Sequence, residues 1–89
     1  MIEFATLFLG LVFGPQQVGF LVHESVAAIE ISLDYQVVGR LNQPPWQLTV
    51  DFGEELAPHV LEVMAYGSSG TELDRAEQWT NVFTQQTEV

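Results

Sequence analysis

Two histidines and one nearby carboxylate are the side chains in this 89-residue sequence that best suit a transition metal. His23, Glu24 and His59 would supply two imidazoles and a carboxylate, which are common zinc ligands. No short motif such as His-x-x-x-His places two of them on one face of one element. We therefore expect solvated side chains here, with no metal and no cofactor.

A short acidic stretch offers hard oxygens that suit calcium. Asp51, Glu54 and Glu55 lie close together in the sequence, around a glycine that would form a turn. A calcium site needs several oxygens that converge, commonly from an Asp-x-Asp pattern, and this stretch has none. A solvated acidic turn is the first interpretation, and a calcium-binding domain stays an alternative.

The residue types of a hydrolytic triad also occur side by side. If Ser25, His23 and Glu24 lie on an extended strand, neighbours point to opposite faces and form no proton relay. The sequence also lacks a G-x-S-x-G turn, a phosphate-binding loop and any cysteine nucleophile. We expect a protein that is not an enzyme.

Charge narrows the choice of partner. Twelve acidic residues stand against two basic ones, Arg40 and Arg75, which gives a net charge of −10. Such a chain repels phosphate backbones and anionic lipids, so nucleic-acid binding and membrane-surface binding are not expected. The balance suits a basic or cationic partner.

The chain is long enough for one modest hydrophobic core, and 47% of its residues are hydrophobic. We expect one domain over residues 1–84 and a C-terminal tail over 85–89. The apolar block at residues 4–13 is well short of the roughly 20 residues that a spanning helix requires, and Gly14-Pro15 interrupts it. We predict folded strand and core here, without membrane insertion.

Apolar residues recur with a period of two along most of the chain, which is the pattern of half-buried strands. The clearest case is "AAIEISLDY", where Ile29, Ile31 and Leu33 alternate with polar residues. Extended segments are predicted over residues 2–8, 16–23, 27–35, 36–41, 46–52, 59–66 and 72–83. A helix over residues 73–79 is the main competing interpretation of the last one. About seven short strands separated by turn residues predict an all-β, antiparallel sandwich of two sheets.

The prolines of "PPWQLTVDF" fit this architecture. Pro44 and Pro45 have no amide proton, so they mark a crossover or a protected edge. Trp46, at the head of the next strand, is expected in the core between the sheets.

The stretch "VAAIEISLDYQVVGRLNQPPWQLTVDFGEELAPHVLEVMAYGSSGTEL" resembles bacterial immunoglobulin-like modules of secreted and cell-surface proteins, some beside von Willebrand factor A domains. The resemblance covers about residues 14–83, and its sharpest parts include Leu33-Asp34, Pro44-Pro45-Trp46 and Ala65-Tyr66. It implies a non-catalytic module that spaces, presents or binds. Tyr35 departs from the glycine that the family has at this turn, so a different turn is expected.

Exposed apolar residues on the first and last strands are the candidate interaction surface. Alternate residues of an extended segment leave opposite faces, so "FLGLVF" cannot bury all its side chains unless it bends at Gly10 or a longer parent chain covers it. The candidate residues are Leu9, Leu11, Phe13, Tyr35, Trp79 and Phe83.

Two functions follow as expectations. One is an interaction or spacer module of a larger exported protein, located extracellularly, in the periplasm or at the cell surface. It would contact neighbouring domains, a protein partner, or a second copy through an edge strand. The other is a calcium- or carbohydrate-binding β-domain, for which Tyr35, Trp46 and Trp79 would be the stacking aromatics.

Overall fold

The alternating segments form short antiparallel strands in the computed structural model, which describes residues 1–82. Within this range the strands are β1 (Ile2–Phe4), β2 (Pro15–Val22), β3 (Ala28–Leu33), β4 (Gln36–Leu41), β5 (Gln47–Asp51), β6 (His59–Tyr66) and β7 (Glu72–Thr80). The predicted count and kind of element are confirmed. The expected tail, residues 85–89, lies outside the described residues.

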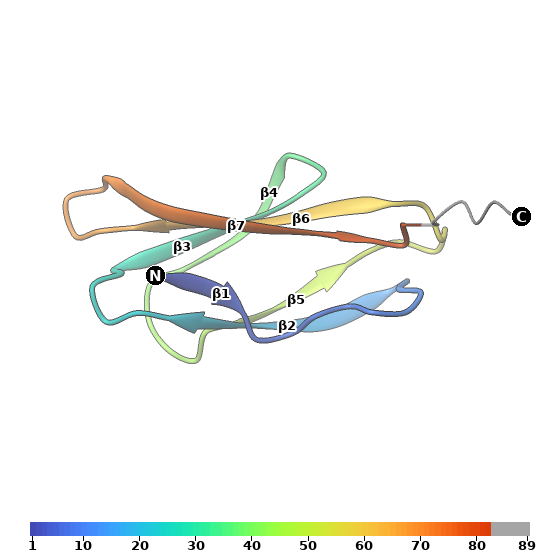
Figure 1. Ribbon diagram of the computed structural model, residues 1–89, viewed down its shortest axis with the longest axis horizontal. Coiled ribbons are helices and arrows are strands. Elements are labelled where there is room, and N and C mark those ends of the chain that lie inside the picture. The colour runs from blue at the N-terminus through green and yellow to red at the C-terminus, as the bar shows by residue number, and fades with distance from the viewer. Residues whose placement is uncertain (83–89) are drawn as a thin grey trace, which may run out of the picture.

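The strands pair into two sheets that lie face to face (Figure 1). One sheet has the order β1-β2-β5 and the other has the order β4-β3-β6-β7. Every pairing is antiparallel. The two-sheet antiparallel sandwich expected from the sequence is therefore confirmed.

The core lies between the two sheets and contains the side chains that the alternation predicted to point inward. Ile29 and Ile31 of β3 are fully buried beside Val63 and Ala65 of β6. From the opposite sheet the core receives Val18, Phe20, Val50 and Phe52. Burying branched aliphatic and aromatic side chains in this way supplies most of the stabilisation of such a domain.

The last strand is extended and not helical. β7 pairs with β6 along its whole length, and its even-numbered residues face the other sheet. The competing helix over residues 73–79 is wrong, because β-sheet pairing with β6 outweighs the helix propensity of this stretch.

The turn between β3 and β4 keeps the left-handed geometry despite its tyrosine. Asp34 and Tyr35 have φ values of 53° and 68°, and Leu33 pairs with Gln36 across this two-residue loop. Positive φ at both central positions is the signature of the type I′ hairpin turn. The expectation of a different turn at Tyr35 is wrong: the tyrosine adopts the conformation in which glycine is more usual.

The two prolines lie in the crossover from β4, at the edge of one sheet, to β5, at the edge of the other. Trp46 follows them and is half-buried against the core cluster. The prediction of a crossover is confirmed. Trp46 was predicted in the core, but its side chain is only partly buried. It lies at the start of β5, an edge strand, and within residues 1–82 no further strand covers it on that side.

The N-terminal segment departs most from the prediction. Only Ile2–Phe4 form a strand, and residues 5–13 have no regular secondary structure. Within residues 1–82 there is no helix of the length and hydrophobicity needed to cross a membrane.

Candidate interaction surface

Residues 5–13, which we call the strap, connect β1 to the hairpin that enters β2 (Figure 1). The strap leaves β2 early: the amides of Ala5 and Thr6 donate to the Gly19 carbonyl at 2.8 and 3.4 Å. From there it passes along β7, an edge strand of the other sheet. It therefore closes one edge of the sandwich.

Two amide side chains of the β7 end hold the strap. Gln78 donates through Nε2 to the Thr6 carbonyl at 2.9 Å and accepts from the Phe8 amide at 3.2 Å. Asn81 accepts from the Val12 amide at 2.7 Å and donates to the Val12 carbonyl at 2.8 Å. A primary amide has the same donor and acceptor as a peptide group, so these side chains replace a backbone ladder.

Asn81 carries the firmer of the two attachments. It is 5% exposed, and its Nδ2 also donates to the Ala57 carbonyl at 3.1 Å. Its φ is 56°, a conformation that asparagine tolerates better than most residues. One buried side chain thus joins the strap, β7 and the loop before β6.

Side chains alternate along the strap although it is not a strand. Val12 is buried and Phe8 is half-buried, with its ring 5.4 Å from that of Phe52. The odd-numbered apolar residues point to solvent, and we call them the apolar strip: Leu7, 64% exposed, Leu9, 93%, Leu11, 57%, and Phe13, 58%. Three of these four are candidates from the sequence; Leu7 was missed, although the same period of two includes it.

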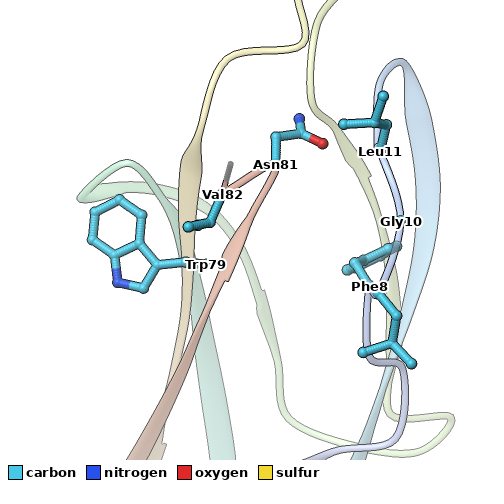
Figure 2. A pocket seen from close by; sticks show the side chains of 7 residues that line it. Phe8, Gly10, Leu11, Trp79, Asn81 and Val82 are labelled. Carbon is cyan, nitrogen blue, oxygen red and sulfur yellow. The ribbon is translucent and has the colours of Figure 1, made fainter. Parts of the chain in front are cut away.

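A groove of about 420 Å³ runs between the strap and the end of β7 (Figure 2). Its lining residues are Phe8, Leu9, Gly10, Leu11, Trp79, Asn81 and Val82. In Figure 2 the indole of Trp79 points away from Leu11, so the tryptophan side chain does not join the apolar strip.

The remaining candidates lie elsewhere. Trp79 pairs with Val60 across β6 and β7 and, at 50% exposure, lies on the outer face of the four-stranded sheet. Tyr35, 72% exposed, occupies the β3–β4 turn. Phe83 lies outside the described residues. The structure thus places Leu9, Leu11 and Phe13 on one strip. Trp79 lines the same groove as Leu9 and Leu11, but its indole points away from Leu11.

The acidic loop after β5 lies next to one end of the strap. Gly14 and the loop are joined by two backbone bonds, from the Gly14 amide to the Gly53 carbonyl at 2.7 Å and from the Phe52 amide to the Gly14 carbonyl at 3.0 Å. Asp51, Glu54 and Glu55 are all exposed in or beside this loop, and Asp51 accepts the Gly53 amide at 2.9 Å. The loop is a region of negative charge beside Phe13.

The groups considered for metal chemistry are not gathered. No three His, Cys, Asp or Glu side chains in residues 1–82 converge as a metal site would require. His23 lies after β2, next to Met1, in the connection that leads to β3. β6 begins at His59 and ends at Tyr66, which pairs with Ala28 at the start of β3. His59 therefore lies at the opposite end of β6 from this connection.

His23 and Ser25 contradict one step of the sequence reasoning. Because β2 ends at Val22, they lie in a turn, and Nδ1 of His23 is 2.8 Å from Oγ of Ser25. The argument that strand geometry separates them is therefore wrong. The Ser25 amide also donates to this nitrogen at 3.1 Å, so the contact closes a local turn.

His59 instead ties β6 to the β3–β4 turn. Its Nδ1 is 2.6 Å from Oδ2 of Asp34, whose Oδ1 accepts the Val60 amide at 3.0 Å. Burial alone would raise the pKa of Asp34, but the hydrogen bonds from His59 and Val60 and the charge of His59 hold it below its ordinary value. This pair fixes the tyrosine-bearing turn.

Comparison with known proteins identifies the fold. No protein-family model and no curated protein matches the sequence. The chain is similar in structure to the fibronectin(III)-like modules of Clostridium thermocellum CbhA, with a TM-score of 0.77. The match covers 90% of this chain and 93% of that chain at 14% sequence identity. The fold is a fibronectin(III)-like, immunoglobulin-like β-sandwich.

Proposed function

We propose that this chain is a non-catalytic module of a larger exported protein, and that it contacts a protein partner or a neighbouring domain through the apolar strip. The observation that carries the proposal is the strip itself. Four large apolar side chains, Leu7, Leu9, Leu11 and Phe13, lie more than half exposed on one continuous segment. Exposed apolar residues gathered in this way mark a protein contact more often than scattered ones do.

The mode of attachment supports the same interpretation. A strap needed only to close the edge of the sandwich could pair with β7 through its backbone, and its outer side chains could be polar. Here side-chain amides hold the strap. The side chains that it exposes from Leu7 to Phe13 are all apolar. The fold and the resemblance to modules of secreted and surface proteins support the modular, exported setting.

Site-specific crosslinking in the full-length parent protein tests the contact. A photoreactive amino acid replaces Leu9, and a matched variant carries it at Thr49, which is exposed on β5, the edge strand opposite β1 in the three-stranded sheet. We expect adducts from position 9, either to a neighbouring domain or to another protein, and none above background from position 49. Equal yields at the two positions would refute the proposed contact, and cell fractionation of the same protein tests export.

The ligand-binding alternative has a simple assay of its own. A ligand that binds only the folded state raises the thermal midpoint. For the interaction module, we expect millimolar calcium or a glycan panel to leave the midpoint of the isolated domain unchanged. A saturable rise with calcium that Glu54→Gln abolishes would instead assign the acidic loop as a calcium site.

A further inference from the structure

The strap has an open backbone edge. Within residues 1–82, the backbone of residues 7–13 makes no hydrogen bond to another backbone group. Its bonds go to the side chains of Gln78, Asn81 and Gln16. The chain bends at Gly10, and on either side of this bend the remaining amides and carbonyls of residues 7–13 form a template on which another strand can add.

The residues of the strap do nothing to prevent such addition. Natural edge strands are protected by Lys, Pro, inward charges or bulges. Residues 5–13 contain no charged residue and no proline. At Gly10 a Cβ atom would meet nothing within 4 Å, so the middle of the strap is open to an approaching backbone. Alternate apolar side chains on the strap suit alternate apolar side chains on a partner.

A second copy of this chain is a poor occupant. Each copy carries a net charge of −10. Its two arginines already face carboxylates of the same chain, Arg75 with Glu72 at 2.9 Å and Arg40 with Glu30 at 3.7 Å. Association of two such chains would oppose like charges without free guanidinium groups to offset them.

The charge next to the strip favours a basic occupant. The acidic loop with Asp51, Glu54 and Glu55 adjoins the Phe13 end of the strip through the Gly14–Gly53 backbone pair. A partner strand laid along the strap would bring its end within reach of these carboxylates. Complementary charge at the rim of an interface raises the association rate and selects against acidic competitors.

We propose that the apolar strip and its groove bind an extended, positively charged protein segment that adds along the strap and places apolar side chains at alternate positions. This inference rests on the proposed function, and it specifies the chemistry of the partner.

Selection from a random peptide library tests the chemistry directly. The folded domain is used to select displayed peptides of about twelve residues, long enough to span the strap, and enriched peptides are then titrated by fluorescence anisotropy. We expect enrichment of peptides with net positive charge and apolar residues at every second position. Leu9→Ser with Leu11→Ser should weaken their binding at least about tenfold, as loss of central apolar anchors does.

A matched pair of charge variants separates local from general attraction. Glu54→Gln with Glu55→Gln removes two charges beside the strip. Glu62→Gln with Glu77→Gln removes two charges on the outer face of the four-stranded sheet. We expect a loss of about threefold to tenfold from the first pair and less than about twofold from the second, in proportion to rim charges. Circular dichroism and thermal melts confirm that all variants fold.

Each outcome has one meaning. Enrichment of neutral or acidic peptides, or an equal loss of affinity from the two pairs of charge variants, overturns the basic partner. If the Leu9 and Leu11 variant still loses binding in that case, the proposed contact stands. Unchanged binding by that variant, or no enrichment, overturns this inference, and the crosslinking experiment then decides the proposed function separately. A dimer in sedimentation that the same variant abolishes would assign the surface to a second copy.

Discussion

The amide of Asn81 should contribute a large share of the stability of this domain, because it satisfies three backbone groups that are otherwise left near the core. They are the Val12 amide, the Val12 carbonyl and the Ala57 carbonyl. A hydrogen bond contributes about 0.5–1.5 kcal/mol, and a buried group left without a partner costs about 1–3 kcal/mol. Asn81→Gly, which removes the side chain but tolerates a φ of 56°, should therefore lower the free energy of unfolding by about 2–4 kcal/mol.

Asn81→Ala provides the matched comparison. Alanine removes the same hydrogen bonds but places a Cβ in the left-handed region, at a φ of 56°. That conformation costs an L-residue about 1–2 kcal/mol. We expect the alanine variant to be less stable than the glycine variant, the reverse of the order in an ordinary strand, where glycine is the worse residue.

Urea unfolding followed by tryptophan fluorescence measures both variants. With an m-value of about 1–2 kcal/mol/M for a small domain, a loss of about 3 kcal/mol lowers the midpoint by about 1.5–3 M. Hydrogen exchange should show faster exchange of the Val12 amide, with the Ile31 amide of β3 as the internal reference. A glycine variant with the wild-type midpoint, or an alanine variant more stable than the glycine variant, would refute the role given to this side chain.

Four further substitutions test the turn and the packing between the sheets. Gly39→Ala should lower the free energy of unfolding by about 1–3 kcal/mol through overpacking, because the new Cβ would lie 2.6 Å from a Leu48 methyl group. Gly10→Ala is the control. Its Cβ meets open space, so the melting temperature should stay within about 2 °C of wild type. Tyr35→Gly should raise the thermal midpoint, because the φ of 68° costs a tyrosine about 1–2 kcal/mol more than it costs a glycine; a lower midpoint would contradict this. Because the folded-state pKa of Asp34 is lowered, its contribution to stability is fully present above the unfolded-state value near 3.9 and is lost as pH falls through the lower folded-state pKa. Asp34→Asn should therefore be less stable at pH 7, and the difference from wild type should shrink in acid-unfolding curves; a constant difference would contradict the assignment.

The period of two was sufficient to predict the sandwich because each core strand has one face in the interior. Ile29 and Ile31 of β3, and Val63 and Ala65 of β6, take the inward positions that the alternation gave them. A shift of one residue would have moved every one of these side chains to solvent, so the pattern specifies the register strongly. The same reasoning overestimated Trp46, because alternation tells which face a side chain takes but not whether its strand lies at an edge.

Turn conformation could not be read from residue types alone. Glycine at this turn, as in the modules that the sequence resembles, would make positive φ inexpensive, and the tyrosine here suggested another turn. What overrides the local preference is tertiary: Asp34 is held by the His59 ring and the Val60 amide, from a strand more than twenty residues away in sequence. Two long-range hydrogen bonds of about 1 kcal/mol each are enough to offset a left-handed tyrosine.

The strap illustrates why a surface was easier to predict than its attachment. The alternation in "TLFLGLVF" already separates Phe8 and Val12 from Leu9, Leu11 and Phe13, whether or not the segment joins a sheet, because any extended backbone turns successive side chains to opposite sides. The amides of Gln78 and Asn81 carry no such signal, since a polar residue near the end of a strand is usually solvated. Their role depends on a segment about seventy residues earlier in the chain lying within hydrogen-bonding distance. Gln78 and Asn81 occupy the Phe8 amide and the two backbone groups of Val12, and the other amides and carbonyls of residues 7–12 make no hydrogen bond within residues 1–82. This property, which no pattern in the sequence reveals, is what makes the strap a surface for strand addition.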